Sequence, residues 1–289
     1  MVQKYFSVTT SDRDILKQDI IRELIYKQAD ELLVGKNAVE MMPIPKLDIK
    51  FDIPKATRIS SSIISEGARA PLSQLGFWQL PVSMVKYQTG VMITDESKAR
   101  QVANNQMQMT LDACARGMAY DMDTEIFTAL CAGTGQHVHA AAVWNTSAAS
   151  PATDVANVLD QIFTNTTVMD SDLKKIKVFV PAKIWAHLAR SIEMGTLQMT
   201  LKTWMESQQS VTLYPTRQLT TFALVVLPGT ETAVHLTYNG TDVPTAEQER
   251  IVGVGDSYVI TRYYKTLVIP DSVNGTTTSR MAAILDVCT

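Results

Sequence analysis

The strongest constraint on the fold is one long helical pattern between Thr94 and about Ala132, which only Gly117 interrupts. Thr94 suits the N-cap position, no proline follows it until Pro151, and Gly133-Thr134-Gly135 provides a stop. At 1.5 Å per residue this helix would span about 57 Å, well beyond the mean helix of about three turns. The apolar residues that keep the 3.6-residue period are Val102, Ala103, Met107, Leu111, Cys114, Ala115, Met118, Met122, Ile126 and Leu130. The pattern predicts a spine helix across which other elements lie.

A shorter helix is predicted over residues 11–34, with Ser11 or Asp12 as the N-cap and Gly35 at its end. The segment after it, AVEMMPIPKLDIKFDIPKATRISSSII, contains three prolines and short β-prone runs. Such a composition favours an extended arm over a compact lobe. We therefore expect this part of the chain to lie across another surface.

Two strand-like runs, 51–64 and 82–93, flank the stretch SEGARAPLSQLGFWQLP, which is rich in Gly, Pro and small residues. This pattern predicts a long two-stranded ribbon. Its end carries the apolar residues Leu72, Leu75, Phe77, Trp78 and Leu80. An isolated ribbon is marginal in water and would expose an apolar patch, so the sequence predicts that another subunit covers it.

The rest of the chain alternates between helical and strand patterns. Helices are expected at 153–166, in AKIWAHLARSIEMG and at 197–206; strands are expected in KIKVFVP and at 222–227 and 233–238. Asn239-Gly240 and Asn274-Gly275 are both typical of tight hairpin turns. We expect the lobe to close near Gly253 and the last two strands to return to the spine helix. The fold class predicted is therefore α+β.

Composition excludes several classes of protein. Lys and Arg number 26 against 29 Asp and Glu, a formal net charge of -3, so no strong field would draw the whole chain to nucleic acid or an anionic membrane. The three cysteines have no CxxC spacing, which argues against a disulfide framework or a zinc site. No signal-like segment or run of 18 apolar residues occurs. We expect synthesis and assembly in a cytoplasm, without membrane contact.

No motif carries recognisable chemistry. His137-Val-His139 supplies two imidazoles, which are too few for a metal site. Asp121, Asp123 and Glu125 lack the glycine and final glutamate of a calcium loop. Gly253-Val-Gly255 lacks the third glycine of a dinucleotide fingerprint, and no GxSxG elbow is present. We expect no catalysis, no cofactor and no metal.

The order of elements resembles that of the HK97-like major capsid proteins of tailed double-stranded DNA viruses. The resemblance covers nearly the whole chain and rests on SEGARAPLSQ, VSMVKYQTGVMITDESKA, DMDTEIFTAL running into GTG, and GDSYVITRYYKTLVIPD. It implies an N-terminal arm at 1–50 and an extended E-loop at 51–93. It also implies a peripheral domain at 94–150 and 251–289, with an inserted axial domain at 151–250.

The resemblance further implies a protein that assembles into pentamers and hexamers of an icosahedral bacteriophage head. Scaffold and portal proteins would be further partners, and double-stranded DNA would be enclosed without sequence-specific binding. An encapsulin-type compartment shell of the same fold is the nearest alternative, and a soluble α/β enzyme or binding protein is another. Unlike many members, this chain has only about 45 residues before the ribbon, so a scaffolding region is either cleaved or replaced by a separate protein.

Eight residues are candidates for contacts between subunits. On the ribbon, Arg58 and Arg69 with Glu66 could form guanidinium–carboxylate pairs, although exposed charges contribute little by themselves. Phe77 and Trp78 are the better anchors, because aromatic residues dominate interface energetics. Lys86 corresponds in type to the loop lysine that some family members crosslink, but no partner asparagine is identifiable. Asp121 and Glu125 form an acidic stripe on the spine that would gain from a basic partner.

Overall fold

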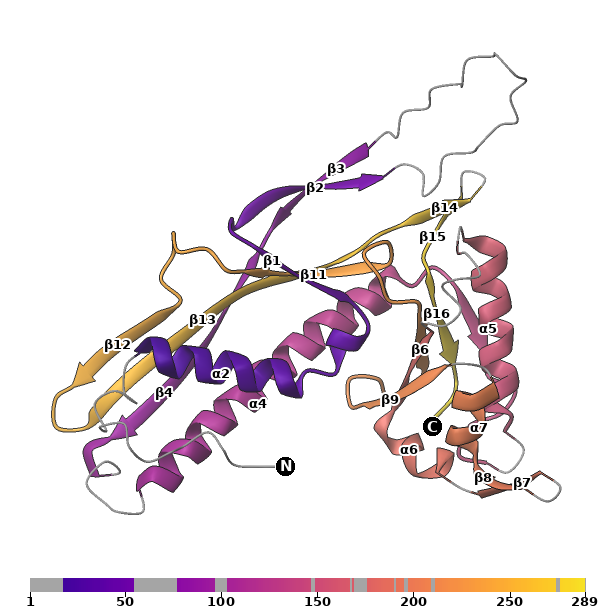
Figure 1. Cartoon of the computed structure of the whole chain (residues 1–289), viewed down its shortest axis with the longest axis horizontal. Helices are drawn as coiled ribbons and strands as arrows, with labels where there is room; N and C mark the ends of the chain where they lie inside the picture. The colour runs from indigo at the N-terminus through magenta and orange to yellow at the C-terminus, as the bar shows by residue number, and fades with distance from the viewer. Residues whose placement is uncertain are drawn as a thin grey trace, which may run out of the picture.

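The computed structural model describes most of the chain. The described residues are 18–54, 77–96, 103–146, 149–166, 168, 176–189, 191–194, 197–208, 211–273 and 276–288. One five-stranded sheet lies along a long helix, a second lies at the end of that helix, and a two-stranded ribbon projects from the body (Figure 1). The chain is therefore of the α+β class that its sequence predicts.

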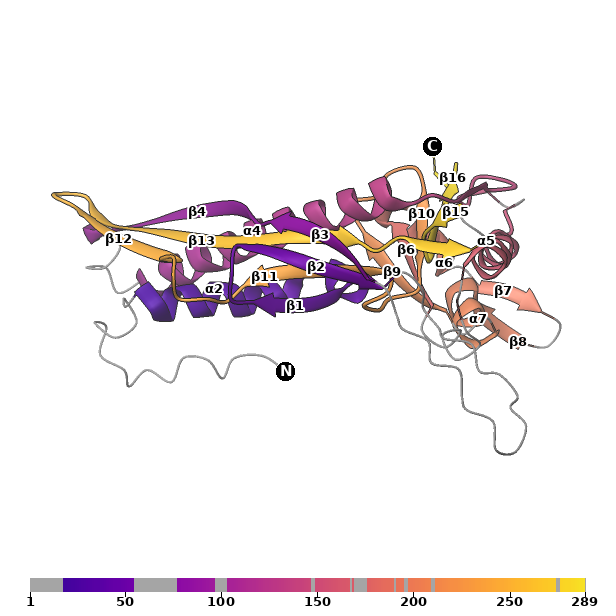
Figure 2. The same cartoon turned by 90° about the horizontal axis from the view of Figure 1, so that it is seen from above.

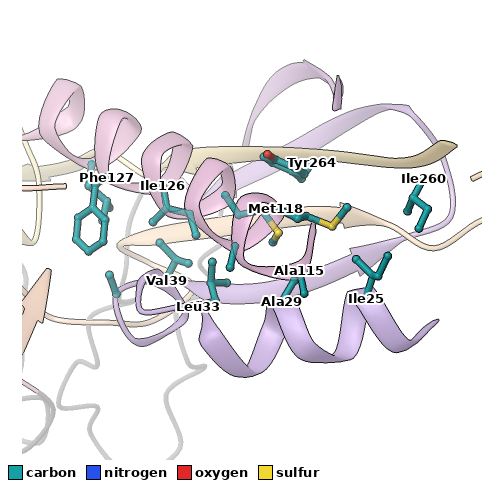
Figure 3. Close-up of a cluster of buried hydrophobic side chains, with 14 of the residues drawn as sticks. Ile25, Ala29, Leu33, Val39, Ala115, Met118, Ile126, Phe127, Ile260 and Tyr264 are labelled. Carbon is teal, nitrogen blue, oxygen red and sulfur yellow. The ribbon is translucent and has the colours of Figure 1, made fainter. Parts of the chain in front are cut away.

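The long helix α4 runs from Ala103 to Gly133, 31 residues, which corresponds to about 46 Å. It ends at the predicted glycine, while the preceding residues 97–102 lie outside the described part. The first helix α2 (Gln18–Leu32) packs on α4 and is followed by a 3-10 turn, η1 (Gly35–Asn37). Both helices bury one face completely, as Ile25, Ala29 and Ala115 show in Figure 3. The spine predicted from periodicity is confirmed over these residues.

The spine sheet packs on these two helices. Its strand order is β1 (Glu40–Ile44), β11 (Ala233–Tyr238), β13 (Gly255–Val268) and β12 (Ala246–Ile251), with β4 (Val85–Thr94) paired to the other side of β13. Tyr258, Ile260 and Tyr264 of β13 point from this sheet into the core beneath α4. The spine sheet, α2 and α4 thus share one hydrophobic core.

The lobe sheet lies at the other end of α4. Its order is β5 (His137–His139), β16 (Met281–Leu285), β10 (Ala223–Val226), β6 (Lys177–Pro181) and β9 (Thr212–Thr216). One face packs on the end of α4; the other is covered by α5 (Pro151–Asn165), α6 (Ala182–Leu188) and α7 (Leu201–Gln208). Since both faces are covered, β10 is buried at every residue.

Two details differ from the sequence expectations. Helix α6 stops at Leu188, and its predicted continuation forms β7 (Ser191–Met194). This strand pairs with β8 (Leu197–Thr200), which was predicted as the start of the next helix, because strand pairing overrides the helix propensity of Leu and Met. Asn239-Gly240 is not a hairpin turn, since β11 pairs with β1 and β13 and not with β12. A Cβ at Gly240 would lie 2.4 Å from the carbonyl oxygen of Pro45, so this glycine permits a close backbone approach.

The hairpin at Asn274-Gly275 is confirmed: β14 (Asp271–Val273) pairs with β15 (Thr276–Thr278), with Val273 opposite Thr276. Sheet membership, however, does not follow the expected domain ranges. Strands β11 and β12, expected in the inserted lobe, belong to the spine sheet, and the last strand β16 belongs to the lobe sheet. The chain therefore crosses between the two sheets more often than its linear pattern indicates.

Candidate assembly interface

The ribbon consists of β2 (Asp48–Pro54) and β3 (Phe77–Ser83), paired antiparallel. Its two faces differ because successive side chains of a strand point to opposite sides. One face carries the cross-strand pairs Ile49 with Val82, Phe51 with Leu80 and Ile53 with Trp78. The other face carries the exposed charged residues Asp48, Lys50 and Asp52. The ribbon is thus amphipathic along its described length.

The apolar face of the ribbon is buried at some positions and exposed at others. Ile53 and Val82 are buried against Val234 and Leu236 of β11 and against Ile269. Further along β3, Trp78 is 49% exposed and Leu80 is 38% exposed. Phe77, on the opposite face, is 53% exposed. Trp78 and Leu80 form an apolar surface that the described part of the same chain does not cover, whereas Phe77 is exposed on the other side of the ribbon.

The structure distributes the eight candidate contact residues over different environments. Arg58, Glu66 and Arg69 lie outside the described residues. Phe77 and Trp78 lie together at the start of β3, whereas Lys86 is exposed on β4 and Asp121 is exposed on α4. The residues are therefore not gathered into one site. Of the eight, only Trp78 lies on the apolar face of the ribbon, and Phe77 is exposed on the opposite face.

Glu125 differs from its expected role because its side chain, only 11% exposed, is engaged within its own chain. Its carboxylate accepts the backbone N–H of Thr266 at 2.9 Å and also accepts the Thr266 hydroxyl. Lys265 Nζ lies 3.7 Å away. Glu125 therefore joins the spine helix to β13. The sequence gives no local signal for this contact, which spans 141 residues.

Asp123, in the same acidic run, also serves the fold. Its carboxylate accepts the N–H of Gly35 at 2.6 Å and that of Val34 at 3.2 Å, at the start of η1. Burial raises the pKa of this carboxyl, although the two N–H groups oppose the shift. A Cβ at Gly35 would lie 2.9 Å from Asp123 Oδ1, so the glycine leaves room for the contact. Of the three acidic residues, only Asp121 remains available at the surface.

A second exposed apolar group lies at the turn between β12 and β13. Val252 is 92% exposed there, and Val254 is 41% exposed. Arg250 holds the base of the turn with two hydrogen bonds of 2.6 Å to the carboxylate of Asp95 and one of 3.3 Å to Asp256. The lobe was expected to close near Gly253; a turn is present there, but it joins two strands of the spine sheet and does not separate two lobes. The sequence did not predict this ion-pair cluster.

The two histidines of His137-Val-His139 are not part of a larger group of possible metal ligands within the described residues. No group of three or more His, Cys, Asp or Glu side chains that could hold a metal ion occurs among them. His139 of the His137-Val-His139 pair instead contacts Asp286, with 2.7 Å between Nδ1 and Oδ2. In the described parts of the chain no helix is long and apolar enough to cross a membrane.

One histidine is buried in the spine sheet. His235 of β11 is fully buried, and its Nδ1 lies 2.8 Å from the hydroxyl of Thr266. Glu125 Oε2, 3.7 Å from Nδ1, favours the charged imidazole. Burial and the nearby Arg262 guanidinium outweigh it and lower the pKa of His235 to about 3. His235 is therefore neutral in the folded chain at neutral pH.

We expect the free energy of unfolding to fall as the pH drops from about 6.5 towards about 3. The unfolded chain protonates His235 near its ordinary pKa of 6.5, whereas the folded chain does not until about 3. The unfolded state therefore binds more protons in this window, which costs about 2–3 kcal/mol by about pH 4.5. Urea unfolding of the unassembled chain at about pH 6.5 and at about pH 4.5 measures the loss.

The matched control for this pH dependence is the exposed His137. His235→Gln should remove most of the His235-dependent loss of stability, whereas His137→Gln should retain it. If wild type and His235→Gln lost the same unfolding free energy on acidification, His235 would not be the group responsible for the pH dependence.

No family model matches this chain, and no curated protein matches it. Solved structures do. A virus-like particle from Pyrococcus furiosus shares 10% identity with a TM-score of 0.62, covering 91% of this chain and 97% of that one. A phage-related protein from Bordetella bronchiseptica RB50 shares 11% identity with a TM-score of 0.59, covering 92% and 96%. The capsid structure of the cyanophage P-SCSP1u shares 12% identity with a TM-score of 0.51, covering 86% of each chain.

At these identities the likeness establishes the fold. This chain has the fold of shell-forming proteins. More specifically, it has the HK97-like fold of phage major capsid proteins over most of its length.

Proposed function

We propose that this chain is a major capsid protein that assembles with copies of itself into the closed icosahedral head of a bacteriophage. The observation that carries the proposal is the ribbon's apolar surface at Trp78 and Leu80, which lies on a fold shared with shell proteins. Apolar side chains of this size are normally covered in the functional state. A neighbouring copy of the chain supplies that cover.

In this proposal the parts of the fold have separate tasks. The lobe sheet with α5, α6 and α7 forms the axial domain around the centre of each pentamer or hexamer. The spine sheet with α2 and α4 forms the peripheral domain, and the ribbon is the E-loop that crosses a neighbour. Many modest contacts then add up to a stable shell without any one being strong.

The packaged DNA and the other assembly proteins are part of the same proposal. The shell encloses double-stranded DNA without sequence-specific contacts, which the net charge of -3 suits. Scaffold and portal proteins take part in assembly, which occurs in the host cytoplasm, and the product is the virion capsid. The chain acts as a structural protein and not as an enzyme.

Negative-stain electron microscopy of the expressed full chain tests the proposal. Shells, rings or sheets are expected, together with elution far above the 31.9 kDa of one chain. A dispersed monomer at concentrations that allow capsid assembly would contradict it. Similarity to a virus-like particle favours one alternative, an encapsulin-type shell that encloses protein. Particles isolated from the native host distinguish the two. Protein cargo inside them, with no nuclease-protected DNA, would support the encapsulin-type shell.

A further inference from the structure

Strand β4 is paired along only one of its edges in the described structure. Its ten residues pair antiparallel with β13, from Val85 opposite Tyr264 to Thr94 opposite Gly255. Just beyond, the N–H of Asp95 donates to the carbonyl of Val254 at 2.9 Å. Odd-numbered residues therefore direct their backbone groups to β13. Even-numbered residues of β4 direct theirs to the opposite edge.

Within the described residues, the opposite edge is covered only at its beginning. There β2 pairs with β3, and the last bond of this ladder is donated by the N–H of Met84 to the carbonyl of Leu47 at 3.0 Å. From Lys86 to Met92, no element within the described ranges pairs with this edge. Figure 2 shows β4 running along the border of the body.

An open edge of this length is unusual because it offers unpaired N–H and C=O groups to other chains. Proteins normally block such edges with prolines, bulges or charges. The register of β4 is continuous and its sequence contains no proline, so neither of the first two devices is present. The exposed side chains along it are Lys86, Gln88 and Met92, with Gly90 between them, and Lys86 is the only charge.

We propose that β4 pairs antiparallel with β4 of a second copy, so that two spine sheets join across a two-fold axis. The inference rests on the proposed function only in that copies of the chain meet. A register centred on Gly90 places Gln88 opposite Met92 of the copy. It sets the two Lys86 side chains at opposite ends, where they do not repel, and the space beside Gly90 is open. Two-fold contacts of this kind are the commonest between identical chains.

The alternative partner is the outer edge of β12 from another copy. That strand has six residues against ten in β4 and would satisfy fewer backbone groups. Its Arg250 is already held by Asp95 and Asp256. Self-pairing of β4 is therefore the arrangement that uses more of the open edge.

Disulfide trapping tests this pairing in assembled particles. In the proposed register, Gln88 and Met92 of two copies have Cα atoms about 5.5 Å apart, a distance that a disulfide spans. The variant Gln88→Cys/Met92→Cys should give covalent dimers under mild oxidation, at least ten-fold above either single variant. The wild-type chain measures the background from its free cysteines Cys114, Cys131 and Cys288.

The outcomes separate this inference from the proposed function. Particles of the double variant with no more dimer than wild-type particles would overturn the β4 pairing and leave the shell function intact. As much covalent dimer in a single variant as in the double variant would also overturn it, because the same cysteine of two copies would then be paired, which requires another register. Failure of the wild-type chain to form any particle would instead count against the shell function. Both replaced side chains are exposed, so circular dichroism should show an unchanged fold.

Discussion

Replacing Trp78 and Leu80 together with serine should leave the chain folded and prevent it from forming shells. These side chains are 49% and 38% exposed, so their loss should cost the isolated chain less than the loss of a buried residue, although Trp78 pairs across the ribbon with the buried Ile53. In an assembly each buried aromatic or leucine side chain contributes about 1–3 kcal/mol. Because every subunit of a closed shell repeats the contact, the yield of particles should fall at least ten-fold.

Sedimentation and negative-stain microscopy measure this loss, and circular dichroism reports whether the chain is folded. The matched control is Lys50→Ser/Gln79→Ser, which changes two exposed residues on the opposite face of the same ribbon. The control should assemble nearly as well as wild type. Wild-type particle yields from Trp78→Ser/Leu80→Ser would mean that the apolar face of the ribbon is not an assembly contact.

Local patterns predicted the elements of this fold well where a single physical signal dominates. The 3.6-residue period predicted the spine, and Gly133 marked its end. Asn274-Gly275 predicted the β14–β15 hairpin because a two-residue turn needs those residue types. The ribbon was predicted from two strand-like runs around a stretch rich in Gly and Pro, but its second strand is β3, and most of the predicted run 82–93 lies in β4 of the spine sheet.

Long-range packing could not be predicted from the same signals. Nothing near Glu125 indicates that its carboxylate accepts bonds from Thr266, and nothing near Asp123 indicates that it binds the backbone at Gly35. Likewise, the crossing of β11 and β16 between the sheets depends on which strands pair, and short strand patterns do not encode their partners. Acidic residues on a helix are usually solvated, so a surface role was the natural expectation for Glu125.

The second large effect is expected from Phe127→Ala in the middle of the fold. Phe127 is 2% exposed on α4, and Figure 3 shows it at the end of the cluster beneath the spine. Its ring meets that of Phe179 from β6 edge-on, with centroids 5.3 Å apart. The side chain therefore connects the helix of the spine sheet to the lobe sheet. Removing it leaves a cavity at that connection and should cost about 3–5 kcal/mol of unfolding free energy.

Urea unfolding of the unassembled chain measures this cost, with the exposed neighbour Thr128→Ala as the control, expected to change stability by less than about 0.5 kcal/mol. Phe127→Leu should recover part of the loss, because a leucine refills part of the cavity.

The same variants also test whether the connection between the two sheets matters for assembly. If the lobe must hold a fixed orientation on the spine to pack around a ring centre, Phe127→Ala should form fewer regular particles even at temperatures where it stays folded. If Phe127→Ala lowered the unfolding free energy by less than about 1 kcal/mol, other contacts would be holding the two sheets together.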